Sequence, residues 1–289
     1  MTDVPNSEHV RTHGVAVALG AGGARGIAHI LVIEALDELG VRPSAIAGAS
    51  MGAVVGAAWA AGVCAKDMRA HLQRLLRNRA EVMARIFQAR VGRLSDLFAG
   101  GLQNPILLDG ERILDFFWPQ AVPDRFEDLA VPFTAVATDY YGRRARRFQT
   151  GPLAPAVAAS MAIPGLFKAI EIDGAVLLDG GATDPLPYRG LMGVGDFVIA
   201  CDVTGAPSAQ ARAKATPSAF EAMFGTAQIM QSALTAEALK GARPDLLVRP
   251  QVDRYRVLDF FHAAEILAAA GPIKDEIKRA LDQALSKAL

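Results

Sequence analysis

The chain alternates short, continuously apolar segments with longer segments whose apolar residues recur at helical spacing. Residues 14–19 carry no polar side chain, which is typical of a parallel strand buried on both faces. A glycine-rich loop, residues 20–26, follows that strand. Residues 27–39 then place apolar side chains three and four positions apart before Gly40. The order of strand, loop and helix predicts the first unit of an α/β fold.

The same alternation continues to the end of the chain. Apolar runs predict further strands around Ile46 and at residues 130–139, 176–178, 197–201 and 246–248. Helical spacing predicts helices that include residues 220–239 and 262–285. We therefore predict an α/β protein with a mostly parallel central sheet flanked by helices. Since neither a repeat nor a linker interrupts the pattern, residues 14–289 are expected to form one domain behind a frayed polar tail, residues 1–13.

Residues 66–98 are predicted to be helical and are unusually basic. Between residues 66 and 93 the segment carries eight Lys or Arg side chains and two carboxylates, a net charge of +6 in a chain that is neutral overall. Apolar residues at helical spacing share this segment, and the apolar residues 97–102 follow as an expected hinge. Two interpretations stay open: a solvated helix face, or a cap beside the active site that meets anionic lipid headgroups.

Residues 44–65 hold no charge and repeat glycine at four-residue spacing, at Gly48, Gly52 and Gly56. This pattern occurs in transmembrane helix dimers. The run is rich in Ala and Gly rather than in Leu and Ile, however, and its first residues fit a strand and a turn better. We predict a buried helix that begins near Met51.

The composition fits a compact enzyme, since 52% of the 289 residues are hydrophobic. The 30 Lys and Arg balance the 30 Asp and Glu, so no nucleic-acid partner is expected. Cys64 and Cys201 lie in apolar segments, which fits a reducing compartment and gives no disulfide framework or metal site. The first residues lack the apolar run of a signal peptide. We expect a cytoplasmic protein, peripheral to the inner membrane face, that uses no cofactor or metal.

Gly48-Ala49-Ser50-Met51-Gly52 lies between a predicted strand and a predicted helix. This is the context of a nucleophile elbow, a strained turn that exposes a serine hydroxyl at the end of a strand. The flanking Gly48 and Gly52 let neighbouring backbone approach without Cβ clashes. Ser50 is therefore the candidate nucleophile.

The glycine-rich loop at residues 20–26 allows two interpretations. A dinucleotide-binding loop would need glycine where Ala21 stands and an acid at the end of the next strand, and the chain has neither. A phosphate-binding loop of the Walker type fails as well, because no Gly-Lys-Ser/Thr follows. The better interpretation is an oxyanion hole, in which backbone N–H groups stabilise the charge that develops on an acyl intermediate.

A serine nucleophile needs a proton acceptor, and the residues suggest two. His262 follows the serine and an acid, as in the Ser-Asp-His order of α/β-hydrolases, but it lies where a helix is expected to begin. Asp179 ends a short apolar strand before two glycines, and Pro185 and Pro187 argue against an ordinary hairpin turn there. A carboxylate can take the serine proton directly if desolvation raises its pKa.

Several motifs, in the same order along the chain, resemble the patatin-like phospholipase family, particularly its short bacterial members. The matching segments span roughly residues 14–203: residues 19–29, residues 48–52, residues 159–167 (ASMAIPGLF), and residues 173–187. The resemblance implies a Ser-Asp dyad without histidine, with Ser50 as the nucleophile and Asp179 as the general base.

The resemblance also implies roles for the glycine-rich loop. It implies an oxyanion hole at Gly22, Gly23 and Ala24, with Arg25 and Gly26 supporting the loop. Ala21 departs from the family's usual first glycine, and its Cβ is tolerable where φ is negative.

From the sequence we therefore expect a serine acyl hydrolase that forms an acyl-enzyme on Ser50. The resemblance implies phospholipid or lysophospholipid substrates. A broad carboxylesterase or thioesterase is the alternative within this class. A non-catalytic lipid-binding or scaffold protein and a nucleotide-binding protein are the alternatives outside it. Head group, acyl-chain length, sn-position and oligomeric state are left open.

Overall fold

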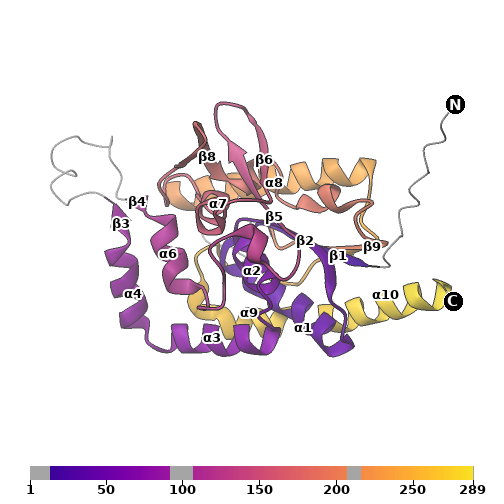
Figure 1. The fold of residues 1–289 in the computed structure, drawn as a ribbon. Coiled ribbons are helices and arrows are strands. Elements are labelled where there is room, and N and C mark those ends of the chain that lie inside the picture. Colours follow the sequence, from indigo (N-terminus) through magenta and orange to yellow (C-terminus); the bar gives the residue numbers. More distant parts are fainter. Residues whose placement is uncertain (1–13, 92–106, 207–215, 289) are drawn as a thin grey trace, which may run out of the picture.

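A computed structural model of the protein describes residues 14–91, 107–206 and 216–288, so the expected tail and the expected hinge lie outside the described residues. Its centre is an eight-stranded sheet in the order β10-β9-β1-β2-β5-β8-β7, with β6 paired to β5 (Figure 1). Five strands run parallel: β10 (Leu246–Val248), β9 (Phe197–Cys201), β1 (Val15–Leu19), β2 (Pro43–Ala49) and β5 (Phe133–Asp139). The remaining strands pair antiparallel: β6 (Arg144–Phe148), β7 (Ile170–Ile172) and β8 (Ala175–Asp179). The predicted α/β fold with a mostly parallel sheet is confirmed.

Alternating residues of β1 show how the two faces of the sheet are covered. Val17 and Leu19 belong to the larger core, which the sheet forms with a layer of helices that includes α1 (His29–Leu39), α2 (Met51–Ala60), α3 (Ala65–Arg77), α7 (Leu153–Ser160), α9 (Ala263–Ala270) and α10 (Ile273–Ala288). Ala16 and Ala18 belong to a smaller core on the opposite face, closed by the 3₁₀ segment η5 (Pro187–Leu191) and by α8 (Ala219–Gly241). Since both faces are covered, an entirely apolar strand is the expected sequence for β1.

Glycine lets α2 approach the sheet closely. A Cβ on Gly52 would lie 2.0 Å from the carbonyl oxygen of Leu19, and one on Gly48 would lie 2.4 Å from that of Gly52. The glycine spacing of residues 48–56 therefore serves packing of a helix on a sheet, as predicted. None of the helices in the described ranges combines the length and the apolar composition of a membrane span.

The basic segment folds into a helical cap at one side of the sheet. It consists of α3 and α4 (Arg79–Gln88) and continues into a small two-stranded sheet of β3 (Arg90–Val91) and β4 (Leu107–Leu108). The helix α6 (Gly110–Phe117) follows, and the side chain of Asp109 caps its first turn. The predicted helix is thus confirmed for most of residues 66–88. It is wrong at Arg90, which belongs to a strand. Residues 92–98 of the predicted segment lie outside the described residues.

Several boundaries differ from those expected. The helix expected at residues 27–39 starts at His29, because a 3₁₀ segment, η1 (Gly23–Ala28), precedes it. The helix expected at residues 262–285 is broken at Gly271 and Pro272 into α9 and α10, since proline cannot supply the N–H that a continuous helix needs. Short 3₁₀ segments complete the described chain: η3 (Phe126–Asp128), η4 (Gly180–Ala182) and η7 (Phe260–His262).

Candidate active site

Ser50 lies in a strained turn between β2 and α2. Its backbone φ of 54° and ψ of −123° fall in a region that residues with a side chain rarely adopt. The residue is buried, and its carbonyl oxygen accepts the N–H groups of Ala53 and Val54 in the first turn of α2. The hydroxyl therefore lies at the positive end of a helix dipole, in the geometry of the predicted nucleophile elbow.

The hydroxyl of Ser50 donates to Oδ2 of Asp179 at 2.6 Å. Asp179 ends β8, next to β5, and its second carboxylate oxygen accepts the N–H of Gly181 at 2.8 Å. Thr138 on β5 holds the strand end by donating to the carbonyl of Asp179 at 2.8 Å. The structure thus brings together two residues that lie 129 positions apart in the sequence.

Burial sets the acidity of this carboxylate. Desolvation raises the pKa of Asp179 to about 6, and the hydrogen bonds from Ser50 and Gly181 oppose that rise. A carboxylate with a pKa near 6 is ionised at neutral pH but accepts a proton much more readily than an exposed aspartate.

Histidine takes no part in this hydrogen-bonded pair. The side chain of His262 is half exposed, and its Nδ1 lies 3.1 Å from Oε1 of Glu265 on the next helix turn. No hydrogen bond joins His262 to Ser50 or Asp179 in the described structure. The described structure thus places Asp179, and not His262, beside Ser50.

The glycine-rich loop lies against two distant carbonyl groups. A Cβ on Gly22 would lie 2.5 Å from the carbonyl oxygen of Val203, and one on Gly23 would lie 2.4 Å from that of Val257. Gly23 also has a positive φ of 57°, so both positions need glycine. The N–H groups of these two glycines donate to no group in the described part of the chain, which leaves them available to an oxyanion.

Ala24 has a different role from the one expected. Its N–H donates to the carbonyl oxygen of Val257 at 2.7 Å, so this donor is already engaged. The structure therefore corrects the assignment of Ala24 to the oxyanion hole: its amide anchors the loop to residue 257. The φ of Ala21 is not positive, so its Cβ is tolerated as expected, and its N–H donates to the carbonyl of Pro185.

Arg25 supports the loop from inside the protein. Its Nε donates to the carbonyl of Val203 at 3.1 Å, and the guanidinium also reaches the carbonyl of Tyr255 and the side chain of Gln228, with the amide oxygen turned toward it. Burial lowers the pKa of Arg25 to about 10, so it stays charged at neutral pH. Next to it, a Cβ on Gly26 would lie 2.4 Å from Cγ of Met51. Arg25 thus joins the loop to residues 203 and 255, and Gly26 lets Met51 pack closely against the loop.

Two further residues hold the site and were not singled out in the sequence. Ser160, at the end of α7, accepts the N–H of Ser50 at 2.9 Å and donates to the carbonyl of Val136 at 2.6 Å. His29 donates from Nε2 to the carbonyl of Gly20 at 2.9 Å, and burial lowers the pKa of His29 to about 4, so it is neutral. Ser160 stands in the matching segment at residues 159–167, and that position was its only signal in the sequence.

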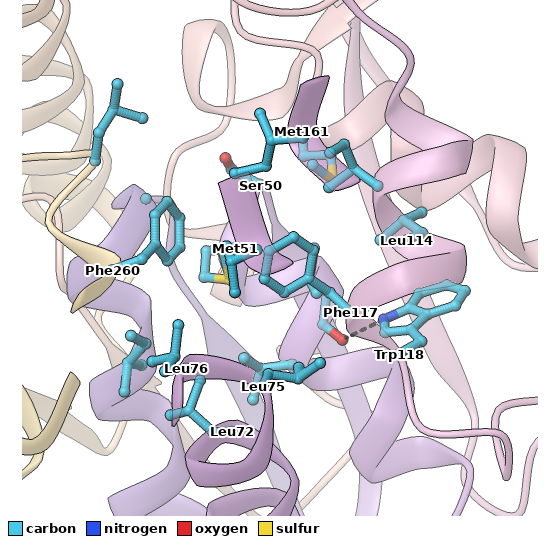
Figure 2. Close-up of a pocket in the computed structure, with 18 of the residues that line it drawn as sticks. Ser50, Met51, Leu72, Leu75, Leu76, Leu114, Phe117, Trp118, Met161 and Phe260 are labelled. Carbon is cyan, nitrogen blue, oxygen red and sulfur yellow. Dashed lines mark hydrogen bonds between the residues drawn. The ribbon is translucent and has the colours of Figure 1, made fainter. Parts of the chain in front are cut away.

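An apolar pocket of about 460 Å³ has Ser50 in its wall. Figure 2 shows Ser50 on one side of this pocket, Leu72, Leu75 and Leu76 of α3 on the opposite side, and Phe117 and Trp118 between them. The indole N–H of Trp118 donates to the carbonyl of Val54 at 3.1 Å. The wall therefore presents hydrocarbon, which suits an aliphatic chain.

The same pocket explains the amphipathic pattern of the cap. The apolar side chains of α3 and α4 line the pocket, together with residues of α2 and α6. The cap therefore lies beside the candidate active site, as expected. Within the described ranges, no group of three or more His, Cys, Asp or Glu side chains is placed to hold a metal ion.

Comparison with known proteins gives one family and several relatives. A family model described as patatin-like phospholipase matches residues 17–192. An uncharacterized NTE family protein of Mycobacterium tuberculosis is 43% identical over 199 residues, which cover 68% of this chain and 51% of the relative. A lysophospholipase nte1 of Aspergillus fumigatus is 32% identical over 192 residues, 65% of this chain and 12% of that protein. The chain thus spans about half the length of the mycobacterial relative.

Among solved structures, the full-length ExoU of Pseudomonas aeruginosa, in complex with SpcU, is 14% identical to this chain. The TM-score is 0.47, and the match covers 94% of this chain and 53% of that one.

Proposed function

The chain belongs to the patatin-like phospholipase family, and from that premise we propose that it is a serine hydrolase of fatty-acyl esters in phospholipids or lysophospholipids. The hydrogen bond from Ser50 to Asp179 in the wall of an apolar pocket is the observation that supports this most. Family membership supports lipid-ester chemistry in general. The lysophospholipase name of the Aspergillus relative adds support for the substrate class.

The proposed reaction uses Asp179 as the only base. Asp179 takes the proton of Ser50 as the serine oxygen attacks the ester carbonyl, and the amides of Gly22 and Gly23 stabilise the negative oxygen. The intermediate then releases the alcohol, which receives the proton from Asp179, and leaves an acyl group on Ser50. Asp179 next takes a proton from a water molecule as that water attacks the acyl group. The bond to the serine oxygen then breaks, the fatty acid leaves, and Asp179 returns the proton to the serine oxygen.

The pH dependence of the reaction is expected to follow Asp179. Since burial raises its pKa to about 6, protonation below that pH removes the base, and kcat/KM should rise through about pH 6 and level off above it. The measurement is a pH profile of kcat/KM with a soluble short-chain ester. The His262→Ala variant is the control, and a midpoint that moves in this variant would contradict the assignment.

The apolar pocket supports a preference for long acyl chains, and a panel of fluorogenic esters of graded chain length tests the function. The wild-type protein is expected to prefer long chains. Leu75→Trp fills part of the pocket opposite Ser50, so it should lower kcat/KM for the longest chains by roughly ten-fold or more and leave the shortest ester nearly unchanged.

Leu39→Trp is the matched control, because Leu39 is exposed at the end of α1 and does not line the pocket. Equal loss with every chain length in the Leu75 variant would point to a folding defect. An unchanged chain-length profile would show that the acyl chain binds elsewhere. Rapid hydrolysis of small esters alone, without a preference for chain length, would favour the broad carboxylesterase or thioesterase.

We also propose that the basic cap attracts the protein to anionic membrane surfaces, including the inner membrane face. Several of its cations are engaged: Arg69 pairs with Glu34, Arg85 pairs with Glu81, and Arg79 lies over the ring of Phe261. In the part of the chain that the structure describes, Arg74 and Arg77 of α3 form no ion pair. These two cations are therefore free to meet lipid headgroups.

Replacing both cations tests this second proposal. A basic side chain near an anionic bilayer contributes about 1 kcal/mol, so Arg74→Glu with Arg77→Glu should weaken binding to anionic vesicles by ten-fold or more at low salt. Rising salt should weaken binding of the wild-type protein as well. The measurement is vesicle co-sedimentation at two salt concentrations, with Arg144→Glu on β6 as the control. Vesicle binding that changes neither with salt nor with the double substitution would contradict this proposal and favour a solvated helix face.

A further inference from the structure

The polarity of α8 is inverted over its middle turns. Its inward side carries polar residues: Gln228 and Thr235 are buried, and Ser232 is half-buried. Its outward side carries large apolar residues, and the side chains of Ile229 and Met230 are 58% and 61% exposed. A helix on the surface of a globular protein normally has the opposite arrangement.

Two of the inward polar residues bond at or near Arg25 of the glycine-rich loop. Gln228 accepts from Arg25 when its amide oxygen faces the guanidinium, and Ser232 donates to the carbonyl of Gly205 at 3.2 Å. The side chain of Gln231 packs closely on Gly181, since a Cβ on Gly181 would lie 2.5 Å from the amide nitrogen of Gln231. Gln228 and Ser232 thus bind groups beside the glycine-rich loop, whereas the buried hydroxyl of Thr235 has no hydrogen-bond partner in the described structure. The apolar side of the helix faces outward.

The outward side is apolar and uncharged over the middle of the helix. Its exposed large side chains are Met223, Ile229, Met230 and Leu234, hereafter the α8 face. No Asp, Glu, Lys or Arg occurs from position 222 to position 236. Exposed apolar patches of this kind mark surfaces that bind a partner or a membrane.

Met223, at one end of the α8 face, lies near the candidate active site, whereas the helix itself lies on the opposite face of the sheet from α3. Met223 lies beside Gly165, where a Cβ would be 3.6 Å from its terminal methyl group, and the adjoining Leu166 lines the apolar pocket. The helix packs on the smaller core, whereas α3 belongs to the larger core on the opposite face of the sheet. Figure 1 accordingly shows α8 along the upper side of the molecule and α3 along the lower side.

We propose that the α8 face docks the protein on the apolar part of a lipid surface, so that the candidate active site is held at the edge of that surface. This proposal rests on the proposed lipid-ester hydrolysis and names the surface through which it would reach aggregated substrate. A face with no charge suits the acyl boundary of a zwitterionic bilayer, where an apolar helix side is buried without the need for anionic headgroups.

The size of the face favours lipid over a second copy of the chain. The α8 face runs from Met223 to Leu234, a stretch of helix about 18 Å long and about 10 Å wide, so it offers on the order of 180 Å². Stable protein interfaces bury about 800 Å² on each partner, more than four times that area. Shallow insertion of a helix side into a bilayer has no such requirement.

The test replaces the two most exposed side chains with a polar helix former. Ile229→Gln with Met230→Gln should weaken co-sedimentation with phosphatidylcholine vesicles by roughly ten-fold, because two apolar contacts are lost. Hydrolysis of a soluble short-chain ester should stay unchanged, since neither side chain touches the dyad. Leu39→Gln is the control, because Leu39 is an exposed apolar residue on α1, which belongs to the larger core.

Each outcome decides the proposal. Selective loss of vesicle binding in the double variant supports it. Equal binding of the variant and the wild-type protein overturns it, as does a wild-type protein that fails to bind phosphatidylcholine vesicles. A wild-type dimer that the double variant converts to a monomer, with vesicle binding unchanged, would assign the face to a second copy. Absence of ester hydrolysis in the wild-type protein would refute the proposed function instead. Vesicle binding is measured separately and still tests the docking proposal.

Discussion

Asp179→Asn is expected to lower kcat/KM by about 10²–10⁴-fold, the range that a positioned general base contributes. The variant keeps the shape of the side chain and can still accept the N–H of Gly181, but it cannot take the proton of Ser50. His262→Ala should change kcat/KM little, because His262 pairs with Glu265 on the surface. The measurement is hydrolysis of one soluble ester by the wild-type protein and the two variants.

The melting temperature of the Asp179→Asn variant serves as a control for folding. Burial raises the pKa of Asp179, so its ionised form is less stable in the folded protein than in the unfolded chain. Above about pH 6 the Asn variant removes this desolvated charge, and its Tm should equal or exceed that of the wild-type protein. Below the pKa of Asp179 in the unfolded chain, this side chain is neutral in both the folded and the unfolded protein. The difference in Tm between the variant and the wild-type protein should then vanish. A large activity loss in His262→Ala at unchanged Tm would favour a triad.

Ser50→Ala is expected to have the largest effect, a loss of up to about 10⁶-fold in kcat, as for other serine nucleophiles. Alanine keeps the buried backbone but has no oxygen to form an acyl-enzyme. Ser50→Gly is a second variant with the same expected loss, and it should not lower the Tm, because glycine adopts a φ of 54° without strain. Turnover close to that of the wild-type protein in either variant would mean that another residue is the nucleophile.

The closeness of Ser50 and Asp179 could be anticipated because each residue has a local signal in the sequence. Ser50 follows a strand and precedes a helix, and Asp179 ends a strand before two glycines. The parallel strands could be predicted as well, since burial on both faces makes them continuously apolar. In contrast, β6 carries three arginines and β7 is only three residues long, so neither shows the alternation that marks a strand.

The support of the site could not be predicted, because it depends on partners far along the chain. Ser160 is 110 positions from the amide it accepts, and Arg25 is 178 positions from the carbonyl of Val203. The engagement of Ala24 by Val257 likewise follows from packing between distant segments. The orientation of α8 could not be predicted either: its sequence predicts a helix, and only the fold shows which side faces out.

Labelling by a fluorophosphonate tests the central claim, an activated Ser50, most directly. The probe reacts with a serine only where a base and an oxyanion site activate it. Mass spectrometry of the wild-type protein is predicted to find the label on the peptide that contains Ser50, and Asp179→Asn should slow that labelling strongly. A label on a different serine, or an unlabelled Ser50 in a folded protein that hydrolyses esters, would contradict the account.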